Sequence, residues 1–134
     1  MSYVVWQEKF RIGIPEVDDD HKMLFDLIDQ FHEAYARGSA SHDPERVFSV
    51  LLAYTDRHFV REEGLMRDAG YGGLAAHVCA HRALRLDVVA FYERFRRGEQ
   101  AGLCLELLAF LKNWLHFHIM EDDMAFKKVF RPGG

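Results

Sequence analysis

The stretch from His58 to His81 constrains the fold of this 134-residue chain more than any other. It carries two pairs of side chains that can bind metal, His58 with Glu62 and His77 with His81. Residues four apart in an α-helix lie only about 40° apart around the axis, so each pair shares one helix face. The glycine-rich segment 70–73 between the pairs favours a chain reversal. The stretch therefore predicts a helical hairpin that presents a histidine–carboxylate pair and a histidine–histidine pair.

Hydrophobic residues recur at three- and four-residue steps in four long segments, and no segment alternates as a strand does. The pattern predicts helices from about 18 to 37, 44 to 69, 74 to 97 and 103 to 126, each with one apolar stripe. Short links between helices favour antiparallel neighbours. We therefore expect an all-α fold, an antiparallel up-down-up-down four-helix bundle, formed by residues 1–134 as a single domain.

The first 17 residues predict an irregular N-terminal arm, because Gly13 and Pro15 interrupt any regular element there. Its aromatic and branched side chains are expected to pack on the helices. The acidic run Asp18-Asp19-Asp20 offers an N-cap and a negatively charged first turn, so we expect the first helix to begin there.

Charge and composition exclude several classes of partner. The net charge is −4, and acidic and basic residues are interspersed, which argues against a nucleic-acid partner. The N-terminus has no signal-peptide pattern, and no apolar run approaches the roughly 20 residues of a membrane span, so we expect no membrane association and a cytoplasmic location. The two cysteines, Cys79 and Cys104, form no CxxC motif and are expected to be reduced thiols.

The chain has eight histidines, and five of them lie on the apolar stripes of the predicted helices: His21, His58, His77, His81 and His118. A single histidine on such a stripe is more often a core residue with a satisfied hydrogen bond. Five of them on four helices change that expectation, because burying unpartnered imidazoles would cost a few kcal/mol each. The five therefore predict a metal centre.

The other three histidines are expected at the surface. His42 lies in the polar loop between the first two helices, His32 lies far along its helix from His21, and His116 points roughly opposite to His118.

Two carboxylates are candidates to complete the site, Glu62 and one residue of the run 121–123. Glu62 shares a helix face with His58, whereas Glu63 lies about 140° from His58 and is expected to face outward. In the acidic run, periodicity alone favours Asp122, four residues after His118. Asp123, five residues after His118, fits only if the helix is locally distorted.

The chain resembles hemerythrin, particularly the single-domain bacterial form, along essentially its whole length. The matching pieces are Trp6, the segment GIPEVD at 13–18 leading to His21, HFxxEE at 58–63 with Met66, Tyr71, HxxxH at 77–81, and WLxxHIxxxD at 114–123. The last motif selects Asp123 over Asp122. Two positions depart from the family pattern: Gly72 stands where proline often follows the tyrosine, and Asp20 stands where glutamine commonly precedes the first histidine.

The resemblance implies a non-haem di-iron centre that binds O2 reversibly. It implies that His77, His81 and His118 hold one iron and that His21 and His58 hold the other. Glu62 and Asp123 would bridge the two ions together with an oxo or hydroxo oxygen from solvent. A lone structural zinc needs only four ligands and would leave about three of the buried groups idle.

The expected function is therefore that of an oxygen carrier, store or delivery protein rather than an enzyme. The protein that receives the O2 is unknown. The alternative is an oxygen- or redox-sensing module that acts through a separate partner protein. A di-iron oxidase would be expected to have more carboxylates, in Glu-x-x-His pairs on two helices.

Overall fold

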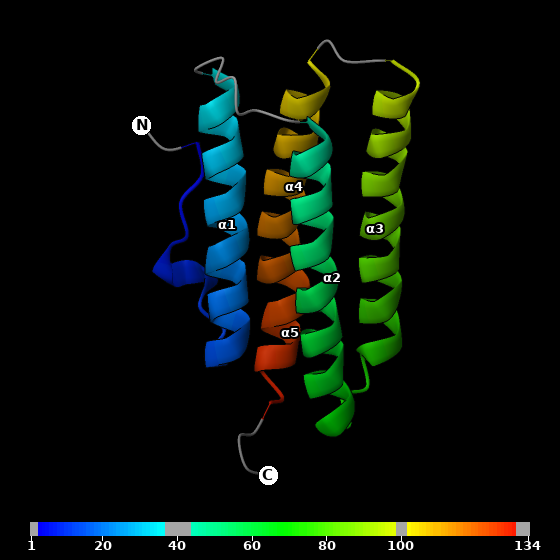
Figure 1. The fold of residues 1–134 in the computed structure, drawn as a ribbon. Helices are drawn as coiled ribbons and strands as arrows, with labels where there is room; N and C mark the ends of the chain where they lie inside the picture. Colours follow the sequence, from blue (N-terminus) through cyan, green and yellow to red (C-terminus); the bar gives the residue numbers. More distant parts are fainter. Residues whose placement is uncertain (1–2, 37–43, 99–101, 131–134) are drawn as a thin grey trace.

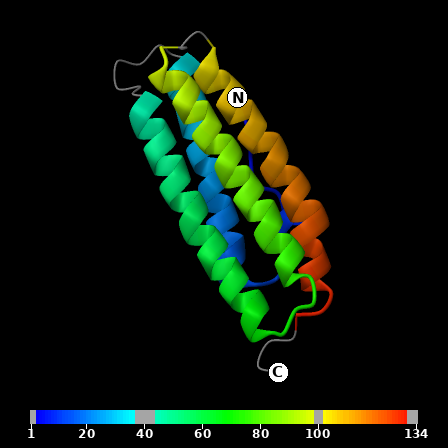
Figure 2. The ribbon, with the colours of Figure 1, turned by 90° about the vertical axis from the view of Figure 1, so that its right-hand side faces the viewer.

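Four long helices lie side by side in the computed structural model, which describes residues 3–36, 44–98 and 102–130 (Figures 1 and 2). Each helix packs against the next one in the chain, and the fourth also packs against the first. Successive helices run in opposite directions, which confirms the predicted up-down-up-down bundle. The helices are α1 (Pro15–Ala36), α2 (Pro44–Asp68), α3 (Leu74–Arg96) and α4 (Leu103–His118).

The fourth helix does not stop at His118. It continues through a π-helical turn, η2 (Ile119–Asp123), into the short helix α5 (Met124–Lys127). A π turn accommodates one residue more than an α turn, so it rotates the following residues relative to a regular helix. The structure thus has a distortion between His118 and Asp123, where the sequence required one if these two side chains were to share a face.

The predicted start of the first helix was wrong by three residues. The helix α1 begins at Pro15, because proline suits the first helical position, where its missing N–H needs no partner. Asp18 does not cap the helix. Its buried carboxylate accepts hydrogen bonds from the backbone N–H groups of Ile12 at 2.9 Å and Gly13 at 3.1 Å. These bonds fold the N-terminal arm back against α1.

The arm contributes to the core, as predicted. It contains one 3-10 turn, η1 (Glu8–Phe10), and runs beside α1 (Figure 1). The side chains of Phe10, Ile12 and Ile14 are almost completely buried in the same cluster as the apolar stripes of the helices. The arm therefore covers one side of the bundle instead of hanging free.

The chain reverses direction between α2 and α3 at the glycine-rich segment 70–73, as predicted. Gly70 has a φ of 66°, and the N–H of Tyr71 donates to the carbonyl of Met66 at 2.9 Å. The Tyr71 ring lies so close to Gly73 that a Cβ there would be 2.7 Å from it. The same ring contacts Phe126 of α5, with the ring centroids 5.1 Å apart. The turn thus holds the C-terminal end of α2, the N-terminal end of α3 and the short helix α5 together.

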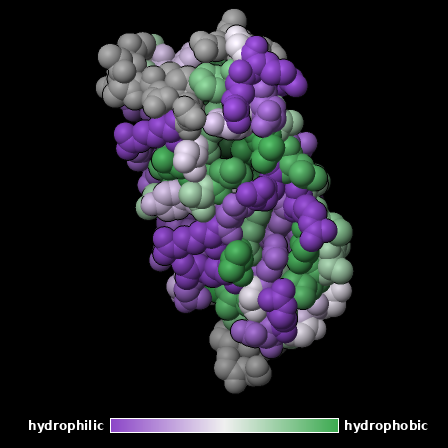
Figure 3. Space-filling model, turned by 45° about the vertical axis from the view of Figure 1, so that its right-hand side comes forward, coloured by the Kyte–Doolittle hydropathy of each residue, from purple (hydrophilic) through white to green (hydrophobic). Residues whose placement is uncertain are grey.

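The face of the molecule seen in Figure 3 mixes hydrophilic and hydrophobic residues. Val60 of α2 and Leu86 of α3 are among the exposed hydrophobic side chains. Within the described ranges, no helix is both long and apolar enough to cross a membrane.

Candidate metal centre

Seven buried polar side chains meet at one level inside the bundle, and none is more than 4% exposed. Every long helix contributes at least one of them, and the π turn supplies the last. The structure brings together all seven side chains that were predicted as ligands. They are His21 of α1, His58 and Glu62 of α2, His77 and His81 of α3, His118 of α4 and Asp123 of η2.

The five imidazoles all direct Nε2 into the cluster. The Nε2 atoms of His21 and His58 are 3.1 Å apart, and those of His81 and His118 are 3.0 Å apart. Two imidazole nitrogens bound at right angles to one octahedral metal ion, at about 2.1 Å each, would lie about 3 Å apart. The spacing of the nitrogens therefore fits neighbouring ligands of one ion.

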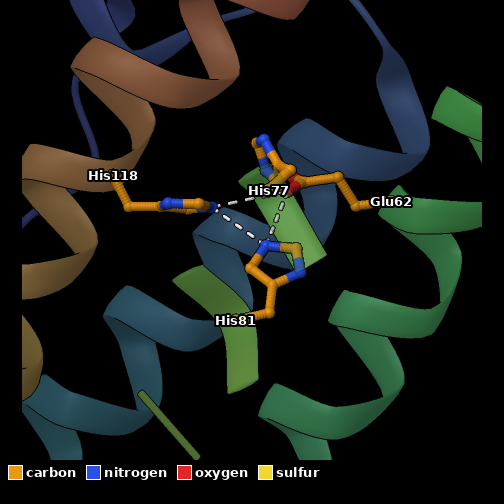
Figure 4. A group of neighbouring side chains, drawn as sticks. All are labelled: Glu62, His77, His81 and His118. Atoms are coloured by element: carbon orange, nitrogen blue, oxygen red, sulfur yellow. Dashed lines mark hydrogen bonds and ion pairs between the residues drawn. The ribbon is translucent and has the colours of Figure 1, made fainter. Parts of the chain in front are cut away.

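The side chains form two groups whose donor atoms lie within 4.8 Å of one another. Figure 4 shows the first group, Glu62 with His77, His81 and His118. The second group consists of His21 and His58 with Glu62 and Asp123. Because Glu62 belongs to both groups, the cluster has the form of two adjoining sites rather than one.

The two oxygens of Glu62 face different groups. Oε1 contacts Nε2 of His77 and lies 3.1 Å from Nε2 of His81. Oε2 lies 3.2 Å from Nε2 of His58.

Asp123 divides its oxygens in the same way. Oδ1 lies 3.0 Å from Nε2 of His77 and 3.4 Å from Nε2 of His118, while Oδ2 lies 3.1 Å from Nε2 of His21. Each carboxylate thus reaches from one histidine group to the other, which is the arrangement that a pair of bridged metal ions requires.

The hydrogen bonding of the cluster is incomplete in a way that fits metal. Oε2 of Glu62 and both oxygens of Asp123 are buried and receive no well-directed hydrogen bond, although imidazole nitrogens lie close to them. Leaving buried carboxylate oxygens without a donor is costly. Cations placed between the carboxylates and the imidazoles would satisfy them. The donor set of imidazole nitrogens and carboxylate oxygens suits first-row metal ions.

The pKa values of His58, His77 and Glu62 also indicate a site that attracts cations. Burial lowers the pKa of His58, but Glu62 and Asp20 outweigh it and raise the pKa to about 10. Burial also opposes protonation of His77, yet Asp123 and Glu62 raise its pKa to about 9. Burial disfavours ionised Glu62, but the charge of His58 and the imidazole hydrogen bonds hold its pKa well below the usual value. The carboxylates therefore attract positive charge, which protons supply when no metal is bound.

Three of the five histidines also contact a carboxylate through the ring nitrogen that faces away from the cluster. Nδ1 of His118 lies 2.8 Å from Asp122, and Nδ1 of His81 lies 2.8 Å from Glu63. If Nε2 binds metal, Nδ1 carries the proton. The Nδ1–H group then donates a hydrogen bond to the carboxylate, which fixes the orientation of the ring. Nδ1 of His58 makes the same kind of contact with Asp20, at 3.1 Å.

Sequence reasoning missed these three carboxylates. The prediction that Glu63 faces outward was wrong, because its side chain is only 21% exposed and lies against His81. For Asp122 the signal was present: periodicity placed it on the face of His118, where it contacts Nδ1. For Asp20 the signals were its position next to His21 and its departure from the glutamine that is common there in the family.

The remaining histidines lie elsewhere. The ring of His32 stacks on Tyr3 with the centroids 3.7 Å apart, and His116 is exposed beside Phe10. His42 lies outside the described residues. Of the two free cysteines, Cys79 is exposed and Cys104 is buried.

Apolar side chains enclose the side of the cluster that faces the middle of the bundle. Trp114 stacks on His118 with the ring centroids 4.3 Å apart, and Phe59 stacks on His81 at 3.7 Å. Beyond them lies a cavity of about 20 Å³, lined by these two rings, Leu115 and further residues that are apolar except for Thr55. A space of this size holds about one water-sized molecule, and its lining offers water few polar partners.

Comparison with known proteins finds similar sequences and structures among hemerythrins. A family model described as "Hemerythrin HHE cation binding domain" matches residues 12–130. A bacteriohemerythrin of Pseudomonas aeruginosa is 35% identical over 131 residues, which cover 98% of this chain and 84% of that protein. Hemerythrin subunit 2 of Golfingia vulgaris is 32% identical, with 92% and 90% of the two chains covered. A crystal structure of a wild-type hemerythrin superposes with a TM-score of 0.85 at 26% identity, covering 96% of this chain and 98% of that one.

Proposed function

This chain belongs to the hemerythrin family, and from that premise we propose how its own residues hold the metal and handle O2. The protein binds O2 at a non-haem di-iron centre. The buried histidine and carboxylate cluster inside the bundle is the place where the two ions fit.

We assign His77, His81 and His118 to one iron, and His21 and His58 to the other. Glu62 and Asp123 would each supply one carboxylate oxygen to each of the two ions. One observation carries this assignment: each carboxylate directs one oxygen to the first histidine group and the other oxygen to the second. The side with His21 and His58 would hold its ion with one histidine fewer, and this side would be the one open to O2.

When bound, the iron pair supplies the electrons that reversible O2 binding uses. The chain supplies the surroundings. Phe59 and Trp114 cover the rings of His81 and His118 with apolar surface, beside a small cavity whose lining is largely apolar. A dry, apolar environment opposes the release of charged, reduced oxygen species and so slows irreversible oxidation of the centre.

We propose a role as an oxygen carrier, store or delivery protein, and not as an enzyme. The acidic groups nearest the cluster, Asp20, Glu63 and Asp122, each contact a histidine Nδ1, so they serve the ligands rather than a second substrate. The alternative role in oxygen or redox sensing stays a prediction. The geometry of the cluster bears directly on O2 binding, whereas a sensor would also require an output to a partner.

The test is to load the protein with ferrous iron under anaerobic conditions and to record visible spectra through cycles of air and deoxygenation. We expect about two irons per chain and a visible band that appears with O2 and disappears when O2 is removed. A single iron per chain, or oxidation by air without a reversible band, would contradict the proposal.

A further inference from the structure

The three carboxylates that contact histidine Nδ1 atoms differ in their own partners. Oδ2 of Asp20 lies 3.1 Å from Nδ1 of His58 and also 2.9 Å from Nε of Arg61. A single oxygen is therefore hydrogen-bonded to the imidazole and ion-paired with the guanidinium, whose Nε makes no directed hydrogen bond. The ion-pair contacts of Glu63 and Asp122 are instead to their histidines.

The contact between Asp20 and Arg61 is partly shielded from water. The side chain of Asp20 is 19% exposed and that of Arg61 is 36% exposed, while His58 is almost fully buried. Charges that are partly withdrawn from solvent are screened less than surface charges, so Arg61 acts on Asp20 with appreciable strength. The contact also links two helices, because Asp20 belongs to α1 and Arg61 to α2.

A carboxylate that accepts Nδ1–H makes the opposite ring nitrogen a stronger metal ligand and holds the ring in place. A guanidinium on the same oxygen competes for its negative charge and weakens this effect. His58 is thus oriented by an anion whose charge is partly neutralised, whereas within the described part of the chain the carboxylates beside His81 and His118 have no such arginine contact.

We propose that Asp20 and Arg61 form a positioning pair that sets how strongly His58 donates to its metal ion. Asp20 holds the His58 ring with Nε2 directed into the cluster, and Arg61 limits the electron density that Asp20 passes to the ring. The pair thereby makes the ion on the side of His21 and His58 harder to oxidise than an unneutralised carboxylate would. This inference rests on the assignment of His58 as a ligand in the proposed function.

The variants Asp20→Asn, Asp20→Ala and Arg61→Gln separate position from charge. Asparagine keeps an oxygen that accepts Nδ1–H but carries no charge, and alanine removes both. With zinc as the probe, Asp20→Ala is expected to weaken binding of the ion that His58 ligates by about tenfold or more, and Asp20→Asn by less. Equal affinities for the wild type and the alanine variant would overturn the positioning role.

Arg61→Gln tests the charge. In the iron-loaded protein it is expected to lower the midpoint reduction potential and to speed autoxidation, because Asp20 is no longer neutralised. In the double variant Asp20→Asn with Arg61→Gln this effect should disappear, since no anion remains to be released. In the matched control, Glu63→Gln with Arg61→Gln, the effect should persist, because Glu63 serves His81.

An unchanged potential and autoxidation rate in Arg61→Gln, or an equal change in the Asp20→Asn background, would overturn the charge role. Arg61 is partly exposed, so this variant remains informative if the alanine variant fails to fold. Failure of the proposed function has a different signature: the wild-type protein itself would lack two irons or a reversible O2 band.

Discussion

At the scale of single residues, the surroundings of a histidine decide its role more than its place in the sequence does. His116 and His118 are two residues apart on α4, yet His118 is 1% exposed and His116 is exposed. Trp114 stacks on His118, and Nε2 of His118 lies 3.0 Å from Nε2 of His81. His116 only meets the edge of Phe10, at a ring-centroid distance of 5.1 Å.

Replacing His118 with alanine is expected to remove the O2-dependent band and to lower the iron content below two per chain. The reason is that the three-histidine group loses one ligand while Asp122 loses the Nδ1 contact that it makes in the wild type. Iron analysis and visible spectra of the loaded variant provide the measurement. His116→Ala is the matched control and should keep the iron and the band. If both variants lose the band alike, the assignment of His118 fails.

At the scale of elements, the π turn η2 gives two neighbouring acidic residues different roles. Asp122 contacts Nδ1 of His118 from outside the cluster, and Asp123 is fully buried within it. In a regular α-helix the residue four positions after His118 would share its face, and the residue five positions after would not. The extra residue of the π turn brings Asp123 onto the inner side.

The substitution Asp123→Asn is therefore expected to lower iron binding, because an amide cannot bridge two cations as a carboxylate does. Asp122→Asn should retain two irons per chain, with an affinity lower by about tenfold, since its amide oxygen still accepts the Nδ1–H of His118. Titration with ferrous iron under anaerobic conditions distinguishes the two variants. Loss of iron from the Asp122 variant and not from the Asp123 variant would show that the register of η2 is different.

The apolar stripe of α4 is another feature that belongs to a single element. Leu107 is completely buried between the helices, whereas Leu105 on the same helix is 37% exposed. Leu107→Ala is expected to lower the free energy of unfolding by about 2–5 kcal/mol, because it leaves a cavity in the core. Leu105→Ala should stay within about 0.5 kcal/mol of the wild type. Urea unfolding of the metal-free protein measures both, and a similar loss in the two variants would contradict the assigned stripe.

At the scale of the whole molecule, a cluster of buried polar side chains is set into the apolar core of the bundle. The four helices are held by a continuous apolar core, which does not need metal to be buried. The polar cluster at one level of that core contains carboxylate oxygens without directed donors, which metal would satisfy.

Removal of iron with a chelator is therefore expected to lower the melting temperature while the helical content is kept. An ion present at 100 times its dissociation constant stabilises the folded state by about 2.7 kcal/mol. Far-UV circular dichroism during heating, with and without iron, gives the measurement. A melting temperature that does not depend on iron would argue that the buried cluster is not the binding site.

The sequence by itself determined the helices and the candidates. Hydrophobic spacing predicted the four-helix bundle, and histidines on the apolar stripes, with the i, i+4 pairs of α2 and α3, identified the level at which polar groups are buried. These features are local, because the spacing of side chains around a helix is set by the backbone itself. Periodicity alone favoured Asp122, and only the resemblance to hemerythrin selected Asp123.

The tertiary structure decided which atoms meet. Asp20 and His58 are 38 positions apart, and His81 and Glu63 are 18 apart, so no periodicity within one helix could pair them. The division of the Glu62 and Asp123 oxygens between two histidine groups likewise depends on how four helices pack around them. The beginning of α1 at Pro15 is by contrast local, since proline suits the first helical position and Asp18 bonds to Ile12 and Gly13 only five or six residues before it. Side-chain direction along a helix is local, but the partner it finds belongs to the packing.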